Sequence, residues 1–392
     1  MTCSLLGSSR WPLPRSRSKT CSMQFPITRR LPSPVARCGG DGFGETHAVS
    51  TSMWKACWDS KPPSGTSRPW RRSSRSISIE ELGLIGWLDN LRERMAVAAS
   101  APFAHAEYPL AHTLDYRGDP GLFGPDSVTW RVVGSPISLF GGIRGLLVQA
   151  AHPEVVAGVE DHSRYRQDPL GRLSRTSNYV VATSFGAVPE VEKAVDVVRR
   201  RHVTITGTSH RQIPYTADDP ELSAWVHNSL TAGFLVCHQT FSGEPLTVDE
   251  ADAFVSEQTR VGALLDSDPM PTTADDLLQW VREYPDVGTA PGMEDAVAFL
   301  RRPPLDPLPR FVYRFIFAAV AATVPPRLRD VLGIRRVPGA ILVGKAIAVL
   351  LRWVLGSSPT WKLACLRIDA PLPEGRVFKQ PMLVDVPETL DR

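Results

Sequence analysis

The stretch Asp219-Pro-Glu-Leu-Ser-Ala-Trp-Val-His-Asn-Ser-Leu230 decides the local fold of this part of the chain. Asp219 followed by Pro220 is typical of a helix N-cap and a first helical position. Behind them runs an apolar stripe at helical spacing, formed by Leu222, Trp225, Val226 and Leu230. The stretch therefore predicts an amphipathic helix.

Similar helix signals recur in both directions along the sequence. Thr247 and Glu250 have the spacing of a capping box, and Pro153 is placed to open a helix in its first turn. Further helices are predicted at residues 143–151, 191–198, 274–284, 311–324 and 340–355. Strand-like alternation is scarce, with weak candidates at residues 203–205 and 382–386. We expect an all-α fold, a multi-helix bundle with a single body domain.

Composition separates an N-terminal segment from this body. The chain has 392 residues, of which 43% are hydrophobic and 22% charged, and these values are typical of a globular protein. Residues 1–76 contain 13 basic and three acidic side chains, whereas the remainder contains 31 basic and 38 acidic ones. We expect residues 1–76 to be a disordered, basic Ser/Pro/Arg-rich segment and residues 77–392 to form the domain. The negative net charge of that domain argues against nucleic acid as a partner.

Targeting signals are ambiguous at the N-terminus. The Arg-rich, Ser-rich composition matches an organelle transit peptide, but we favour a disordered tail or a start codon placed too far upstream. No signal peptide is visible and the body has only Cys237 and Cys365, so we expect a reduced, cytoplasmic protein. No apolar run is long enough to span a membrane. The apolar residues of 337–355, beside Lys345 and Arg352, leave a peripheral membrane contact open.

Several catalytic classes lose their support because their motifs are absent. The sequence has no HExxH, GxSxG, GxGxxG or CxxC motif, and no glutamate stands three residues before a histidine. Zincin-type proteases, α/β-hydrolases, dinucleotide-binding enzymes, zinc ribbons and carboxylate di-iron bundles are therefore disfavoured.

His202 is the first candidate for chemistry. A helical stripe that starts at Val191 and Val195 reaches this histidine. A neutral imidazole on an apolar face is either a core histidine with a satisfied N–H or a ligand of a metal or haem. Arg199 lies one turn earlier and is followed by two more arginines. Guanidinium groups suit haem propionates, although arginines near a helix C-terminus also complement the helix dipole.

A second polar group lies upstream, in Asp168-Pro-Leu-Gly-Arg-Leu-Ser-Arg-Thr176. If this stretch is helical, Arg172, Arg175 and Thr176 share one face. A cation and a hydroxyl facing an apolar cavity can stabilise bound dioxygen or a developing oxyanion. The alternative is an ordinary amphipathic surface turn. The remaining candidates, each expected to be structural, are His152, His162 and His227.

Several phrases of the sequence, taken in order, resemble the MpaB-type oxygenase family, which includes the catalytic domain of latex-clearing proteins (rubber oxygenases). The resemblance extends from about Asp126 to about Gly356. The phrases are Gly142-Ile-Arg-Gly-Leu-Leu-Val-Gln-Ala-Ala-His-Pro153, Asp161-His-Ser163, Asp168-Pro-Leu-Gly-Arg-Leu173, Arg175-Thr176, Arg199 with His202 and Gly207, Tyr215-Thr-Ala-Asp-Asp-Pro220, and Trp225-Val-His227.

The resemblance implies an all-α, partly globin-like bundle that holds one haem b. In the latex-clearing branch a helix histidine is the axial iron ligand and an arginine precedes it by three residues; His202 and Arg199 match that pattern. The branch also has an Arg-x-x-Lys-Thr element over the distal face, which Arg172, Arg175 and Thr176 match. Arginine in place of lysine at position 175 keeps the charge but not the compact ammonium group.

Family members cleave carbon–carbon double bonds of isoprenoid chains by oxidation. We place no residue as the distal acid of a rubber-cleaving member, so we expect a small apolar substrate, an unsaturated lipid or terpenoid, together with dioxygen. The chain is thus interpreted as a dioxygenase-type oxidoreductase with haem b. One alternative is a non-catalytic helical protein that binds haem or lipid. Another is a site for a metal other than haem iron, held by His202 with His227 or His152.

Overall fold

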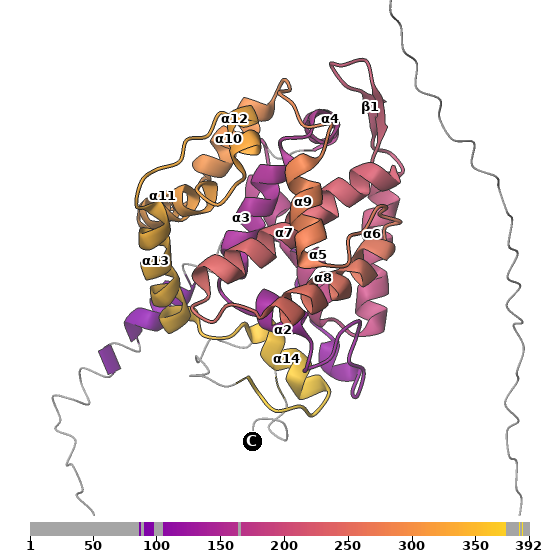
Figure 1. The fold of residues 1–392 in the computed structure, drawn as a ribbon. Helices are drawn as coiled ribbons and strands as arrows, with labels where there is room; N and C mark the ends of the chain where they lie inside the picture. Colours follow the sequence, from indigo (N-terminus) through magenta and orange to yellow (C-terminus); the bar gives the residue numbers. More distant parts are fainter. Residues whose placement is uncertain are drawn as a thin grey trace, which may run out of the picture. The chain divides into compact units, whose positions relative to one another are not determined.

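The computed structural model describes residues 86–87, 90–97, 105–163, 166–373, 384 and 386. The chain divides into two compact units, residues 1–74 and 75–392, and the described residues all belong to the second. The predicted disordered segment 1–76 and the candidate strand at 382–386 lie outside the described residues, apart from 384 and 386. Within the described part, the second unit is a helical bundle with one small hairpin, which confirms the all-α prediction (Figure 1).

Several of the α-helices overlap the residue ranges that sequence signals predicted, and others lie where no helix was predicted. Their bounds are α2 Val128–Val133, α3 Ser138–Gln149, α4 Pro153–His162, α5 Pro169–Phe185, α6 Val188–His202, α7 Pro220–Phe241, α8 Val248–Ala263, α9 Ala274–Glu283, α10 Met293–Arg301, α11 Pro307–Ala321, α12 Pro326–Val331, α13 Ala340–Leu355 and α14 Pro359–Arg367, with a short 3-10 helix, η2, at Thr113–Asp115. Residues 86–87 and 90–97 are also helical.

Helices α3 and α7 cross at the centre of the core, where glycines let their backbones approach closely (Figure 1). A Cβ atom added to Gly233 of α7 would lie 2.5 Å from the carbonyl oxygen of Gly141, and one added to Gly145 of α3 would lie 2.9 Å from the Cα atom of Leu230. A side chain at these positions would force the helices apart. Around this crossing the main apolar cluster is built from residues of α3, α7, α8, α9 and α11.

A smaller apolar cluster holds the C-terminal helix α14 against α2 and α5. Arg367, at the end of α14, is buried there. Its Nη1 donates to the hydroxyl of Thr113 (2.6 Å) and to the carbonyl oxygen of Phe185 (2.7 Å). These bonds attach α14 firmly to the body of the bundle.

Two short features differ from the sequence predictions. The strands are β1 Thr206–Thr208 and β2 Pro214–Thr216, an antiparallel hairpin, whereas the weak strand candidate was at residues 203–205. Three-residue strands are too short for an alternation pattern to locate them. The stretch 102–136, expected to be irregular, contains helix α2, whose N-cap Ser127 accepts a hydrogen bond from the backbone N–H of Trp130.

Among the described residues, no single helix is long and apolar enough to cross a membrane; the bent pair of α13 and α14 passes that test by length and composition.

Candidate active site

The predicted site residues lie on a helical hairpin formed by α5 and α6. Helix α5 begins after Asp168, whose carboxylate accepts from the backbone N–H of Gly171 (3.0 Å). Only residues 186–187 connect the end of α5 to the start of α6, and the two helices pack against each other. Such a pair runs antiparallel. The first turns of α5 and the last turn of α6 therefore lie at the same end of the hairpin.

His202 is the last residue of α6 and is half-buried. Its side chain is 27% exposed, and its Nδ1 atom lies 3.9 Å from Oδ1 of Asp218. Burial lowers the pKa of His202 below its usual value, and the charge of Asp218 opposes this only in part. The imidazole is thus neutral at pH 7. A carboxylate beside Nδ1 favours the proton on that atom and leaves the lone pair on Nε2 for a ligand bond.

Arg199 ties the end of α6 to the end of α8. Its Nε and Nη2 atoms donate to the carbonyl oxygen of Leu264, at 3.0 and 2.7 Å, and Nη2 pairs with Asp266 at 3.0 Å. Leu264 is the C-cap residue of α8, where a cation is favourable. The described contacts of Arg199 are therefore helix-to-helix contacts, and its predicted role toward a haem propionate stays a prediction.

The first turns of α5 contain Arg172, Arg175 and Thr176. Because the backbone is helical here, the three side chains lie on one face of the helix, as expected for a helical stretch. Arg172 donates to the hydroxyl of Ser163. Arg175 pairs with the N-cap Asp168 at 3.0 Å, and Thr176 donates to the carbonyl oxygen of Arg172 at 3.1 Å. Arg175 and Thr176 are exposed, whereas Arg172 is half-buried. Two cations and a hydroxyl therefore stand at the same end of the hairpin as His202.

The donor chemistry at this end fits a haem that would be held through one histidine. A neutral imidazole backed by a carboxylate is the usual arrangement of a metal-binding histidine. Val198 is half-buried beside it and Val203 is 68% exposed, so apolar surface is available next to the imidazole. Within the described residues, no group of three or more His, Cys, Asp or Glu side chains is arranged to hold a metal ion.

The alternative of a non-haem metal held by His202 together with His152 or His227 has no support, because the side chains of His152 and His227 contact other groups. The Nε2 atom of His227 lies 3.0 Å from the carbonyl oxygen of Gln258, and burial lowers the pKa of His227 to about 4. His152 belongs to a separate buried network. The third spare candidate, His162, is exposed and contacts the carbonyl oxygen of Thr206 at 3.0 Å. All three have the structural environments that the sequence analysis expected.

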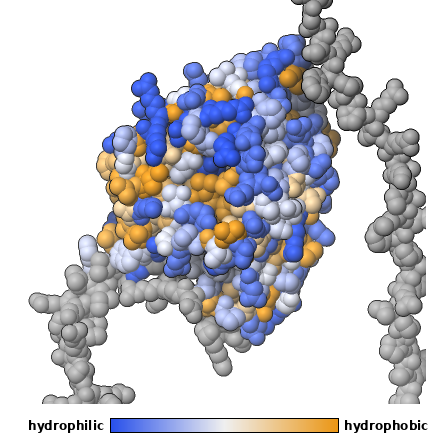
Figure 2. Space-filling view, in the orientation of Figure 1, coloured by the Kyte–Doolittle hydropathy of each residue, from blue (hydrophilic) through white to orange (hydrophobic). Residues whose placement is uncertain are grey.

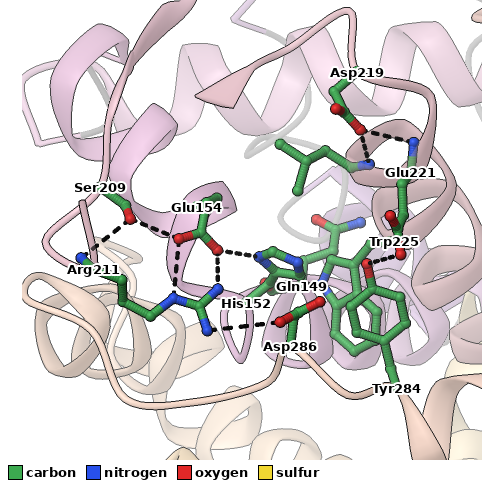
Figure 3. A network of polar contacts seen from close by, with 11 residues as sticks. Gln149, His152, Glu154, Ser209, Arg211, Asp219, Glu221, Trp225, Tyr284 and Asp286 are labelled. Carbon is green, nitrogen blue, oxygen red and sulfur yellow. Dashed lines mark hydrogen bonds and ion pairs between the residues drawn. The ribbon is translucent and has the colours of Figure 1, made fainter. Parts of the chain in front are cut away.

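The buried network around His152 is centred on Glu154, in the first turn of α4 (Figure 3). Glu154 is 4% exposed and accepts from Ser209 Oγ at 2.6 Å and from Arg211 Nε at 3.1 Å; Arg211 Nη2 also donates to it. Burial alone would raise the pKa of Glu154, but the bonds from Arg211 and Ser209 outweigh it and hold the pKa below its usual value. The glutamate is ionised and fastens the hairpin turn to α4.

His152 connects this network to a cluster of aromatic rings (Figure 3). Its Nδ1 atom lies 3.3 Å from Glu154 Oε2, and its ring packs against Trp225 (5.8 Å between centroids) and Tyr284 (5.5 Å). The hydroxyl of Tyr284 donates to Glu221 at 3.1 Å, and Trp225 Nε1 donates to the carbonyl oxygen of Gln149 at 3.3 Å. Burial lowers the pKa of His152, so the ring is a neutral core group.

Sequence reasoning missed Glu154 and Arg211. A glutamate directly after His-Pro, in the first turn of a predicted helix, is as easily a solvated N-terminal acid as a buried one. The partner arginine is 57 residues away and no periodic pattern links the two.

A surface pocket of about 240 Å³ lies beside the network, between α4, the hairpin and α10. Its lining combines small residues with polar side chains, which include Glu160, Asp161, Arg166, His210 and Asp295. This polar pocket is unsuited to an apolar chain, and the apolar access path expected for the substrate stays a prediction.

No curated protein and no solved structure matches the chain significantly. One family does match: ER-bound oxygenase mpaB/B'/Rubber oxygenase, catalytic domain, over residues 130–353. The match covers more than half of the chain and includes α3 to α12, most of α13 and the whole α5–α6 hairpin. The chain therefore belongs to the family of mpaB and rubber oxygenase catalytic domains.

Proposed function

We propose that this oxygenase-family domain is a haem b-dependent oxygenase that uses dioxygen to oxidise a small unsaturated lipid or isoprenoid. The observation that carries the proposal is the neutral, half-buried His202 at the end of α6, with Asp218 behind its Nδ1 atom. Haem b, when bound, supplies the iron chemistry by which dioxygen attacks a carbon–carbon double bond.

The residues of the chain have separate tasks in this proposal. His202 would hold the haem iron through Nε2, and the negative charge of Asp218, 3.9 Å from Nδ1, would favour the tautomer that carries its proton on that atom. Arg172 and Arg175 place positive charge at the same end of the hairpin, and Thr176 adds a hydroxyl. Fixed cations and donors near a reacting centre stabilise negative charge that develops on oxygen. Arg199 holds the last turn of α6 against α8 and so positions His202.

The test is to express the full chain with a haem precursor and to measure its Soret band and its oxygen uptake with a panel of unsaturated terpenoids and fatty acids. We expect a Soret band that shifts with dithionite and carbon monoxide, and uptake with at least one substrate. Arg172→Gln should keep the Soret band and lower turnover by about tenfold or more. The matched control is Arg200→Gln, since Arg200 is exposed and its Nη1 atom lies 4.0 Å from Oδ2 of Asp196.

Two outcomes contradict the proposal. A protein without a Soret band after haem titration would show that the domain does not use haem. A haem-loaded protein that consumes no oxygen with any of the substrates would favour the alternative of a non-catalytic haem- or lipid-binding protein.

A further inference from the structure

Helix α13 exposes several large apolar side chains, whereas Ile341, Ile347 and Leu351 are half-buried against the core. Its buried residues are small, namely Ala340, Gly344 and Ala348, followed by Val354. A Cβ atom added to Gly344 would lie 2.5 Å from the Cβ of Ala319 and 2.9 Å from the ring of Phe241, so no larger residue fits there. Leu342, Val349 and Trp353 are 73%, 57% and 40% exposed. Their spacing of seven and four residues places them on one helix face.

This exposed stripe is part of a wider apolar face. Helix α11 packs against α13, and the loop at residues 335–339 precedes α13. Figure 2 shows the hydrophobic surface over the region that α11 and α13 occupy in Figure 1. We call this surface the α13 face; it consists of Leu308, Phe311, Val337, Leu342, Val343, Val349, Leu350 and Trp353, all of them exposed. An apolar surface of this extent on a folded domain marks a contact site.

The α13 face lies in the most basic part of the domain. Residues 307–355 contain eight arginines and lysines but only one acidic residue, Asp330, although the whole chain has a net charge of +3. The exposed cations in this region are Arg310, Arg314, Arg327, Arg335, Arg336 and Lys345, of which Arg327 donates to the carbonyl oxygen of Tyr284. Arg314 lies over the ring of Phe311, 4.7 Å from its centroid. Long cationic side chains at the border of an apolar surface suit a membrane interface, where their charges reach the lipid headgroups.

We propose that the α13 face binds the surface of an anionic lipid bilayer, with α13 lying in the headgroup region parallel to the membrane plane. The apolar stripe enters the boundary with the acyl chains and the surrounding arginines contact anionic headgroups. A second copy of the chain fits this face poorly, because pairing it with itself would bring two strongly positive surfaces together.

The geometry favours a helix that lies on the membrane over one that crosses it. Helix α13 has 16 residues, about 24 Å of helix, and contains Lys345 and Arg352, whereas the hydrocarbon core is about 30 Å thick. The following helix, α14, is fixed in the body by Leu363, Ala364 and the hydrogen bonds of Arg367. It cannot extend α13 across a bilayer without breaking those contacts.

The test uses the full chain and flotation with two kinds of vesicle, phosphatidylcholine alone and phosphatidylcholine with phosphatidylserine. We expect binding to the anionic vesicles that weakens with added salt. Leu342→Ser combined with Val349→Ser should weaken this binding by about tenfold or more. The matched control is Val248→Ser combined with Val197→Ser, because these side chains are also exposed (77% and 47%) but lie on α8 and α6. Circular dichroism confirms that each variant is folded.

Arg335→Glu combined with Arg336→Glu should reduce the preference for anionic vesicles, since these exposed arginines form part of the basic border. Three results would overturn the proposal. One is the absence of binding to either vesicle. Another is binding that survives the serine substitutions, which would assign it to another part of the chain such as the basic residues 1–76. The third is a dimer that the serine substitutions convert to a monomer, which would make a second copy the occupant.

Discussion

Two regions of the molecule place a histidine near a carboxylate, and their surroundings differ. His152 and Glu154 are 3% and 4% exposed, and Arg211, Ser209 and a cluster of aromatic rings enclose them. His202 and Asp218 are 27% and 52% exposed, 3.9 Å apart, and lie at the end of a helix. A histidine enclosed on all sides holds the fold together. A partly exposed histidine with a single carboxylate 3.9 Å away is available to a ligand.

The largest effect should come from removing the carboxylate of the enclosed region. Glu154→Ala leaves the guanidinium of Arg211 and the hydroxyl of Ser209 without their shared acceptor. We expect the free energy of unfolding to fall by about 3 kcal/mol, measured by urea denaturation. Glu192→Ala, at an exposed position of α6, should change it by less than about 0.5 kcal/mol. Equal effects of the two substitutions would mean that the network contributes nothing to stability.

Acid should destabilise the protein through its buried histidines. Burial lowers the pKa of His227 and of His238 to about 4, whereas the unfolded chain binds these protons near pH 6.5. Because the unfolded state binds more protons between these values, stability falls as the pH drops from about 6.5 to about 4, by on the order of 5 kcal/mol for the two groups.

Glu154 extends this loss to lower pH. Its pKa is held below the usual value, so its contribution is complete above about pH 4.3 and disappears as the pH falls through its folded-state pKa. Urea midpoints measured across this range test both effects. His227→Gln should make the dependence above pH ~4 shallower, since His227 is one of the buried histidines whose protonation burial opposes. A wild-type stability that does not change with pH would refute the account of buried neutral histidines.

Substitutions in the region around His202 and Asp218 should change the free energy of unfolding only slightly. Arg199→Ala removes two hydrogen bonds to the carbonyl oxygen of Leu264 and the ion pair with Asp266, all at a partly exposed site. We expect a loss of about 1 kcal/mol and faster hydrogen exchange at the end of α8. Arg200→Ala is the control, with an expected change within about 0.3 kcal/mol. A loss as large as that of Glu154→Ala would show that this end of the hairpin is as tightly held as the enclosed network.

Local sequence signals predicted much of the helical fold. The capping box of Thr247 and Glu250 is present, with both reciprocal hydrogen bonds, and α13 has the bounds predicted for it. These signals act over three or four residues, so they can be read from one chain. Helix α2 and the hairpin are too short for a periodic pattern, and they depend on contacts with distant segments.

The sequence predicted which residues belong to the candidate site, but not which distant residues they contact. The sequence places Arg172, Arg175 and Thr176 on one face, and the helical backbone of α5 puts them there. Partners far away in the chain could not be foreseen. Arg199 bonds to Leu264, 65 residues later, and Glu154 bonds to Arg211 across 57 residues. Long-range polar pairing depends on the packing of the helices, and no local pattern encodes it.

The most direct test of the central claim, that His202 is the haem ligand, is the Soret absorbance of His202→Ala after expression with a haem precursor. Because His202 is half-buried with one distant carboxylate partner, the variant should stay folded and its stability should change by less than about 1 kcal/mol. We predict that it loses the Soret band, whereas His112→Ala, at an exposed position, keeps it. A folded His202→Ala protein with the full Soret absorbance of the wild type would contradict the account.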